Sequence, residues 1–467
     1  MTRINSFSRI AAALAVMTMI AVPGFAARGH ADFSRFVALG DSYGTGYSNG
    51  SMNERHQIYS WPAIIARQTG APGFVQPLVS YPGLGPEIQL VDVISFPPRL
   101  VTAPGLGSPL LTTYPRAYNN LSIPGANVRD LTALTGGEQN PTGTAAQAAR
   151  FILRGLGTPV QQAVSLNPTF IAVWIGGNDL LTAVLTGTPA TLTSTDSFRT
   201  AYNTMLDQLT AGAPNAGMVV GTLPTNPVAV PLLTTVPPVI INPATRQPLL
   251  GPNGLPIFLV ADLGGGTFGQ LPPGSLVLLP ASARIATGVG FPAALGADPR
   301  FASFPNIGTP LSDAEVLTPA EQAQIVARAA EYNAVITQAA QSRDIPVADI
   351  NGLFNRFAAT GGYHVGPFTF TSSYISGGIF SFDGFHLTDI GYMFFANEYI
   401  RTINRTYDSK IPVMGIWEFF ANNGAFATTS SGAPLTEGME WEMTPAAAES
   451  ILRLATPVKT RRARAGH

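Results

Sequence analysis

The sequence of 467 residues contains no cysteine. Disulfide bonds, cysteine-ligated metals and thiol nucleophiles are therefore excluded. Charge is scarce as well, since charged residues make up 11% of the chain, against about 25% in typical globular proteins. The formal net charge is −1. This balance argues against nucleic acid as a partner, because such binding needs a concentrated basic surface.

Long apolar runs are confined to the N-terminus. Arg3 and Arg9 flank the start, the run "IAAALAVMTMIAV" follows, and small residues come after it. This order is typical of a secretory signal peptide over residues 1–26, with cleavage expected after Ala26 or Ala27. We therefore expect export to the periplasm, the outer membrane or the extracellular space. An uncleaved membrane anchor is the alternative, although the run is short for a bilayer span.

Glycine and proline are abundant, with 48 and 40 residues, and hydrophobic residues make up 46% of the chain. These values favour a folded core that carries long, punctuated loops, and they stay short of the range typical of disorder. The chain is long enough for one elaborated domain or two.

Short apolar runs alternate with amphipathic stretches along most of the chain. The runs predict strands at 35–39, 118–126, 169–175, 217–223 and 345–350. Helices are predicted at 60–70, at 143–157 and the next few residues, at 194–214, and beginning near 318 and 388. Alternation of this kind predicts a parallel sheet covered by helices on both faces.

Two of the predicted helices have clear end signals. Thr318 can cap one of them, Pro319 suits its first position, and Glu321 completes a capping box. In the helix at 60–70, Ser60 is a candidate cap and Gly70 a stop signal.

The segment at 224–310 interrupts this alternation with many prolines and glycines. Between 224 and 290 its only charged residues are Arg246, Asp262 and Arg284. It reads as an insertion that carries hairpins, and it is either a padded edge of the core or an apolar cover beside the active site.

The expected organisation is one main domain at 32–402, interrupted by this insertion. A C-terminal extension at 403–467 is expected to pack on the domain. It contains a short helix that Thr444 can cap, and it ends in a basic tail that we expect to be solvated.

Ser42 lies in the stretch "GDSYGTG", directly after a predicted strand, as a turn residue or as a nucleophile. An activated serine needs a histidine base and a carboxylate that orients the base. Of the five histidines, His30 and His467 lie near the ends, His56 in a polar loop and His364 in a glycine-rich turn.

His386 follows Asp383 by three residues in "FDGFHLTDIGY", just before a helix that Thr388 can cap. Residues three apart on a tight turn can project to one side, so the carboxylate can reach Nδ1 and leave Nε2 for a serine. Asp389 is an alternative partner for His386, although the N-terminus of the helix explains an acid there.

Residues at other strand ends can supply donors for an oxyanion. They are Asn178 in "GGND" and Gly125, together with the backbone amide of Ser42. Asp41 and Asp179 adjoin these residues, and we expect both to hold loops by accepting hydrogen bonds from backbone amides.

Four blocks of the sequence together resemble the GDSL-type (SGNH) serine hydrolase family: "FVALGDSYGTG", "NNLSIPGANVRDL", "VWIGGNDLL" and "FDGFHLTDIGY". The resemblance implies Ser42 as nucleophile and Asp383 and His386 as its triad partners. It implies the Ser42 amide, Gly125 and Asn178 as oxyanion donors, and a three-layer α/β/α, flavodoxin-like core. It covers about 33–70, 117–223 and 312–402.

One departure from the family is Tyr43, which stands where the family name has leucine. We do not interpret it as loss of function, but it can alter access to the serine.

The sequence therefore predicts an exported esterase or lipase that cleaves carboxylic esters, with a small-molecule or lipid ester as substrate and no metal or cofactor. The scarce charge and the apolar insertion favour acyl-chain esters. A carbohydrate O-deacetylase on the same fold and a non-catalytic surface-binding module are the alternatives. We also expect a peripheral contact with a membrane or cell surface.

Overall fold

The computed structural model describes residues 29–92, 98–226 and 229–421. The expected signal peptide, the helix that Thr444 was predicted to cap and the basic tail lie outside these residues. The strands are β1 (Phe36–Gly40), β2 (Ile88–Asp92), β3 (Arg99–Thr102), β4 (Phe170–Trp174), β5 (Gly217–Gly221), β6 (Val260–Asp262), β7 (Phe268–Gln270), β8 (Leu276–Val277), β9 (Val316–Leu317), β10 (Val347–Ala348), β11 (Tyr363–Val365) and β12 (Phe368–Phe370).

The α-helices are α1 (Ser42–Thr45), α2 (Glu54–Gln57), α3 (Trp61–Thr69), α4 (Asp130–Ala133), α5 (Thr144–Leu153), α6 (Pro159–Ser165), α7 (Asn178–Thr186), α8 (Thr195–Gly212), α9 (Pro231–Thr234), α10 (Ser282–Ile285), α11 (Pro319–Gln341), α12 (Ile350–Ala358), α13 (Asp389–Thr406) and α14 (Ile416–Ala421). Short 3₁₀ helices are η1 (Pro189–Thr191), η2 (Leu279–Ala281), η3 (Ala293–Ala297), η4 (Pro299–Phe301) and η5 (Asp313–Glu315). No helix in the described ranges is apolar enough over sufficient length to cross a membrane.

The core of the molecule is a parallel sheet with the order β1-β4-β5-β10. Every residue of β1 and β4 is buried. Strands buried on both faces read as continuous apolar runs, which is how "FVALG" and "FIAVW" appear in the sequence. The predicted parallel sheet is therefore confirmed.

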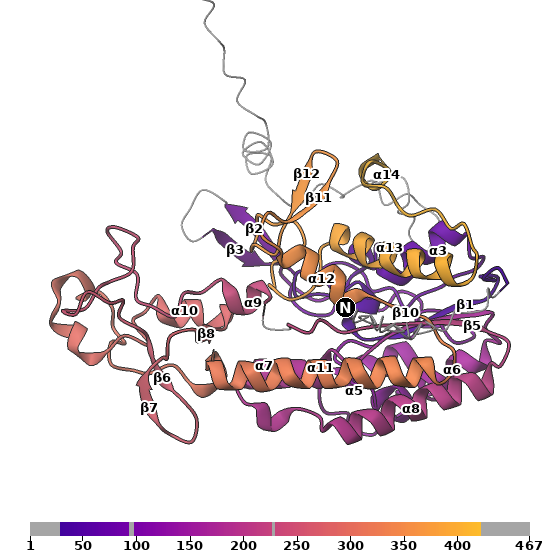
Figure 1. Ribbon diagram of the computed structural model, residues 1–467, viewed down its shortest axis with the longest axis horizontal. Coiled ribbons are helices and arrows are strands. Elements are labelled where there is room, and N and C mark those ends of the chain that lie inside the picture. Colours follow the sequence, from indigo (N-terminus) through magenta and orange to yellow (C-terminus); the bar gives the residue numbers. More distant parts are fainter. Residues whose placement is uncertain (1–28, 93–97, 227–228, 422–467) are drawn as a thin grey trace, which may run out of the picture.

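Helices cover both faces of this sheet, as Figure 1 shows. One layer contains α3, α12 and α13, and the other contains α5, α6, α8 and the long α11. The α/β architecture with three layers agrees with the fold class expected from the sequence.

The segment 118–126 is not a regular strand, so that prediction was wrong in form. It runs beside β1 and pairs through one parallel bridge, Ala38 with Asn120. Leu121 N and Ile123 N donate to carbonyls of β1, whereas the amides of Asn119 and Asn120 donate to Val75 O. Backbone groups directed to a loop cannot continue the ladder, so the edge stays irregular.

The predicted helix ends are confirmed where strong caps are present. Thr318 and Glu321 form a reciprocal capping box at the start of α11, and Ser60 caps α3. Gly70 ends α3 in the left-handed conformation. The single helix predicted from 143 is two helices, because α5 ends at Leu153 and α6 begins after the new cap Thr158.

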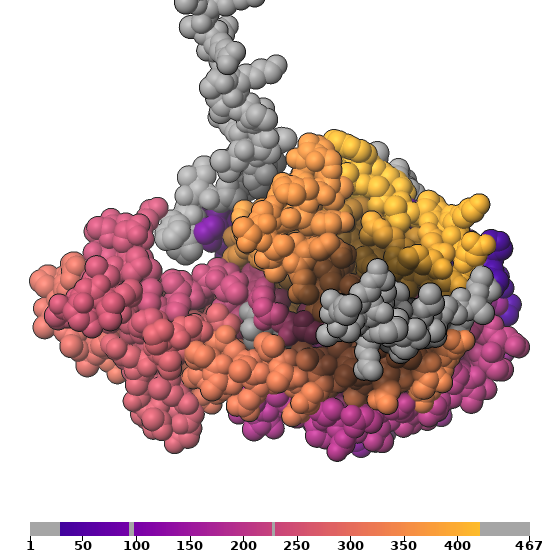
Figure 2. Space-filling model, in the orientation of Figure 1, coloured from indigo at the N-terminus to yellow at the C-terminus, as the bar shows by residue number. Residues whose placement is uncertain are grey.

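A second cluster of buried apolar residues lies apart from the sheet, in a lobe that Figures 1 and 2 show projecting from one end of the molecule. It contains Ile240, Leu249, Leu259, Ala261, Leu271, Val277, Ala281, Val289, Phe291, Phe301, Leu311 and Val316. The segment predicted as an insertion thus has a small apolar core of its own, which continues to Val316.

The described part of the C-terminal extension packs on the main core. The helix α13 continues to Thr406, beyond the domain boundary expected at 402. Asn397 then exchanges two hydrogen bonds of 2.9 Å with the backbone of Met414. Met414 and Phe419 belong to the buried cluster around the sheet.

Candidate active site

Ser42 lies two residues after the end of β1 and is the first residue of α1, at the carboxyl edge of the sheet. Asp41 caps this short helix, and its Oδ1 accepts a hydrogen bond of 3.0 Å from Tyr43 N. Gly44 allows the turn to approach the neighbouring segment, because a Cβ there would lie 2.1 Å from Ser122 Oγ. The small residues of "GDSYGTG" therefore position the Ser42 hydroxyl tightly against the core.

His386 lies between Ser42 and Asp383. Its Nε2 is 2.9 Å from Ser42 Oγ, and its Nδ1 is 2.9 Å from Asp383 Oδ2. The structure thus brings together three residues that are up to 344 positions apart. A hydroxyl, an imidazole and a carboxylate in this order can transfer a proton from the hydroxyl to the ring.

Asp383 is held by backbone donors as well as by the imidazole. Its Oδ1 accepts from the amides of Phe385 and His386, and its Oδ2 accepts from Gly50 N at 2.9 Å. Burial raises the pKa of Asp383, but the charge of His386 and these hydrogen bonds lower it, so the net pKa lies well below the usual range. Asp383 therefore remains an anion beside the ring.

Aromatic side chains surround the His386 ring. The ring centroids of Tyr47, Phe385 and Tyr43 lie 4.6, 5.1 and 5.7 Å from it. The Tyr43 hydroxyl donates to Phe385 O at 2.8 Å. Tyr43 is 3% exposed, so it packs beneath the site and supports the loop of His386.

Gly125 and Asn178 lie on adjoining segments. Gly125 has a φ of +81°, which favours glycine. Asn178 begins α7, and its Nδ2 donates to Ala126 O at 2.8 Å. A primary amide has two N–H donors, so one remains for a ligand. Gly177, next to Asn178, packs on Asp41, because a Cβ there would lie 3.3 Å from Asp41 Oδ2.

The two neighbouring acids hold loops, as expected. Asp41 accepts from Tyr43 N, and Asp179 Oδ2 accepts from Val128 N at 3.1 Å. Burial raises the pKa of Asp41 to about 8, with a further contribution from the charge of Asp179. Burial also raises the pKa of Asp179 to about 6.

His364 and His56 contact different partners. His364 is exposed on β11, and its Nδ1 is 3.0 Å from Thr369 Oγ1. His56, predicted in a polar loop, is on the short helix α2, and Asp389 contacts its Nδ1 at 3.0 Å. The alternative in which Asp389 pairs with His386 is therefore wrong.

The sequence analysis missed the segment that supports Asp383. The side-chain oxygen of Asn49 accepts a hydrogen bond of 3.0 Å from Phe382 N, and the backbone N–H of Asn49 donates to Ser381 Oγ. The backbone N–H of the next residue, Gly50, donates to Asp383 Oδ2. The Asn49–Gly50 dipeptide is a turn signal, and a tight turn directs backbone amides outward. That signal could have drawn attention to this segment, but not to its partner more than 300 residues away.

A small apolar cavity of about 40 Å³ adjoins the site. Three of its lining residues, Tyr43, Gly177 and Phe385, are direct chain neighbours of Ser42, Asn178 and His386. Its other walls come from Trp174, Leu180, Leu181, Val184, Leu223, Pro224, Val230 and Phe354. This cavity can hold a small apolar group.

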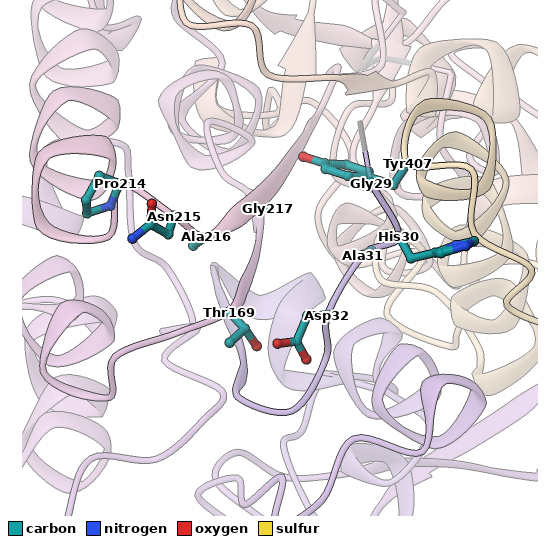
Figure 3. Close-up of a pocket in the computed structure, with 10 residues that line it drawn as sticks. All are labelled: Gly29, His30, Ala31, Asp32, Thr169, Pro214, Asn215, Ala216, Gly217 and Tyr407. Carbon is teal, nitrogen blue, oxygen red and sulfur yellow. The ribbon is translucent and has the colours of Figure 1, made fainter. Parts of the chain in front are cut away.

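A larger cavity of about 370 Å³ lies at the opposite end of the sheet (Figure 3). Thr169 precedes β4 and Gly217 begins β5, so this cavity is at the amino ends of the strands, and Ser42 is at their carboxyl ends. Within the described ranges, no group of three or more His, Asp or Glu residues is arranged to hold a metal ion.

Comparisons with known proteins give one strong match. The family model described as GDSL-like Lipase/Acylhydrolase matches residues 36–399. No curated protein matches the chain.

Several solved structures are similar to the chain at low identity. A phospholipase A1 from Streptomyces albidoflavus is 15% identical, with 82% of this chain and 100% of that chain covered and a TM-score of 0.32. An acetylxylan esterase from Geobacillus stearothermophilus is 12% identical, with coverage of 81% and 96% and a TM-score of 0.32. A family 3 carbohydrate esterase from Clostridium thermocellum is 12% identical, with coverage of 80% and 96% and a TM-score of 0.31. TM-scores this low give these similarities no weight in assigning a substrate.

Proposed function

The chain belongs to the GDSL-like lipase/acylhydrolase family, and on this basis we propose that it is a serine hydrolase that cleaves carboxylic esters. The observation that carries the proposal is the continuous path from Ser42 through His386 to Asp383, with 2.9 Å at each link. Nucleophilic catalysis by serine needs a base within reach of the hydroxyl and a carboxylate that orients the base.

In the acylation step, Ser42 Oγ attacks the ester carbonyl carbon while His386 Nε2 takes the hydroxyl proton. The tetrahedral intermediate collapses by breaking the bond to the alcohol oxygen, and that oxygen receives the proton from Nε2. The acyl group remains on Ser42. Asp383 stays charged and stabilises the imidazolium, which agrees with its lowered pKa.

In the deacylation step, a water molecule takes the place of the alcohol. His386 Nε2 removes a proton from the water as its oxygen attacks the acyl carbon. The second intermediate collapses to the carboxylic acid, and Ser42 Oγ recovers its proton from Nε2. The same residues therefore serve both half-reactions, and the enzyme returns to its starting state.

The oxyanion is stabilised by the amides of Ser42 and Gly125 and by the second N–H of Asn178. The adjoining positions of Asp41, Gly177 and Ala126 support this assignment. Donors that are already oriented cost no reorganisation when charge develops on the carbonyl oxygen. Each such donor typically contributes about 3–4 kcal/mol to lowering the barrier.

The small cavity lined by Tyr43, Gly177 and Phe385, the chain neighbours of the site residues, is assigned to the acyl group of the substrate. Its lining is almost entirely apolar, with Trp174, Leu180 and Val184 among its walls. Burial of a hydrocarbon group contributes roughly 25 cal/mol per Å² of apolar surface. This preference agrees with the acyl-chain esters expected from the scarcity of charge in the sequence.

The volume of this cavity also favours a second candidate function. About 40 Å³ admits a group of only a few heavy atoms. An acetyl group is of that size, so a carbohydrate O-deacetylase is the second candidate. Turnover of esters with acyl chains of two to sixteen carbons, measured beside acetylated sugars, separates the two functions.

Export is part of the proposal. It is supported by the arrangement of Arg3, Arg9 and the apolar run that follows. Expression of the full chain, followed by N-terminal sequencing of the mature protein, tests it. We expect the mature chain to begin at Ala27 or Arg28, and an intact N-terminus would contradict the proposal.

The catalytic proposal is tested by covalent labelling with a fluorophosphonate, which reacts with activated serines. We expect labelling of the wild-type protein, its loss in Ser42→Ala and His386→Ala, and no change in the control Ser342→Ala, an exposed serine that ends α11. A folded wild-type protein that does not react would favour the non-catalytic binding module. Labelling that persists in Ser42→Ala would place the nucleophile elsewhere.

A further inference from the structure

A second buried histidine lies close to the site, between two carboxylates. His56 Nδ1 is 3.0 Å from Asp389 Oδ1, and His56 Nε2 is 3.1 Å from Glu87 Oε1. The side chains of His56 and Glu87 are 16% and 6% exposed. The catalytic steps described above do not use this cluster.

The geometry of the cluster defines where its protons are. A neutral imidazole has one N–H donor and one acceptor nitrogen, whereas an imidazolium donates from both. Both nitrogens of His56 face carboxylate oxygens, so two ionised carboxylates require an imidazolium. The alternative is a neutral ring whose Nε2 accepts a hydrogen bond from a protonated Glu87 carboxyl group.

The groups around the cluster favour the imidazolium. Burial lowers the pKa of His56, but the charges and hydrogen bonds of Asp389 and Glu87 raise it to about 10. Glu87 Oε2 also accepts from Asn53 Nδ2 at 3.0 Å, which stabilises its ionised form. Tyr59 faces Asp389, and burial and that charge keep its phenol neutral with a raised pKa.

Other charged groups near the cluster have their own contacts. On α2 itself, the Arg55 guanidinium lies 3.6 Å from the centroid of the Tyr81 ring. Glu54 begins the same helix, where the helix dipole favours an acid. His56 is therefore the cation that directly bridges Glu87 and Asp389.

The cluster joins the segment that carries both Asp383 and His386 to the segment that supports Asp383. Asp389 begins α13, three residues after His386. On the other side, the Asn49–Gly50 turn lies shortly before α2, and Ile88 N, next to Glu87, donates to Asn49 O at 2.7 Å. The same turn supplies the Gly50 amide that donates to Asp383.

We propose that His56 is a positioning residue: as an imidazolium it joins Glu87 to Asp389, and so holds the Asn49–Gly50 turn against the loop of Asp383 and His386. The proposal rests on the proposed function, because it assigns His56 a role through those two residues. His56 itself touches neither the substrate nor Ser42. Without the cation, the carboxylates of Glu87 and Asp389 repel each other and the turn moves away from Asp383.

The first test needs no substrate and no measurement of activity. We would record ¹⁵N NMR spectra of the histidine rings of wild-type protein at pH 8 and assign His56 by its absence in His56→Gln. Two protonated ring nitrogens are expected at this pH, where an ordinary histidine is neutral. A ring with one protonated nitrogen would overturn the proposal.

The second test separates positioning from stability. In His56→Gln we expect kcat to fall about ten-fold or more while KM stays within about two-fold, since displacement of catalytic groups acts on the chemical step. The rate of fluorophosphonate labelling should fall in parallel. The control His364→Gln alters an exposed histidine on β11 and should keep both constants. A folded His56→Gln protein with unchanged kcat would overturn the proposal.

The double variant His56→Gln/Glu87→Gln keeps the test decisive if the single variant fails to fold. It removes one cation and one anion together, and the two amides can still hydrogen-bond. We expect it to fold with a kcat below that of the wild type; wild-type kcat in it would overturn the need for the imidazolium. If wild-type protein is not labelled at all, the proposed function fails. If wild-type protein is labelled normally and His56→Gln changes neither kcat nor the labelling rate, only the positioning role of His56 is contradicted.

Discussion

Two histidines in this protein are bound by carboxylates, and their surroundings suit them to different tasks. His386 presents Nδ1 to Asp383 and Nε2 to the Ser42 hydroxyl. His56 presents both nitrogens to carboxylates, those of Asp389 and Glu87. Burial does not distinguish them, because the two side chains are 14% and 16% exposed.

The difference lies in the group that faces the second ring nitrogen. A hydroxyl can give up a proton and take it back, so a ring beside it can alternate between neutral and charged forms. A second carboxylate only stabilises the charged form. A histidine with one carboxylate therefore suits proton transfer, and a histidine with two suits a fixed positive charge.

The largest expected effect comes from removing the carboxylate that orients His386. In Asp383→Asn, the amide can hold the ring in the wrong tautomer, with the proton on Nε2. We expect kcat to fall by about 10³–10⁴-fold. Steady-state kinetics with a short-chain ester measure it, and Asp298→Asn, on the separate lobe, is the control. A loss below ten-fold would remove Asp383 from the mechanism.

The next largest effect is expected from removing a donor to the oxyanion, the negative charge that develops on the carbonyl oxygen of the substrate. Asn178→Ala removes one proposed oxyanion donor, and we expect kcat to fall by about 10²–10³-fold with little change in KM. The same substitution at Asn203, partly exposed on α8 and away from the site, should leave kcat unchanged. If KM alone rose, Asn178 would bind the ground state and not the oxyanion.

A third prediction tests the fixed charge of His56 through stability. Its folded pKa of about 10 exceeds the unfolded value of about 6.5. Its contribution is therefore fully present below pH of about 6.5 and is lost as the pH rises toward 10. We expect the difference in Tm between wild type and His56→Gln to shrink over this range.

Asp41, whose pKa is about 8, also reduces stability as the pH rises, but it is present in both proteins. Its contribution therefore cancels in the difference between them. A difference in Tm that stays constant from pH 6 to pH 10 would show that His56 does not titrate in the folded protein as the structure indicates.

The smallest effect is expected from the support beneath His386. Tyr43→Phe removes the hydrogen bond to Phe385 O, worth about 1 kcal/mol, and we expect kcat to fall by less than about ten-fold. Tyr399→Phe is the matched control, since it removes a bond of equal length, 2.8 Å, to Val173 O. We expect the two variants to lose similar amounts of stability. If they also lost kcat equally, a local role for Tyr43 would be contradicted.

Local signals predicted much of the fold. The buried strands appear as apolar runs, and Thr318 and Glu321 mark the start of α11. Where local patterns failed, groups distant in the chain had redirected the backbone. The strand predicted at 118–126 is irregular because amides there donate to Val75.

The residues of the candidate site were also predicted from local patterns, and contacts between distant segments were again missed. Ser42, Asn178 and the Asp383–His386 pair stand in short, recognisable blocks at strand or helix ends. The polar stretch around His56 carries no comparable pattern, and it was expected to be a loop. Nothing local indicates that Glu87, 31 residues on, would meet the same ring.

The sequence by itself determined which residue types were at hand and where strands, caps and turns would form, because those preferences act between neighbours in the chain. Only the tertiary structure decided what faces each ring nitrogen. Asp383 and Asp389 both lie three residues from His386, and packing gives one to His386 and the other to His56. That choice depends on contacts between segments more than 300 residues apart, which no local pattern encodes.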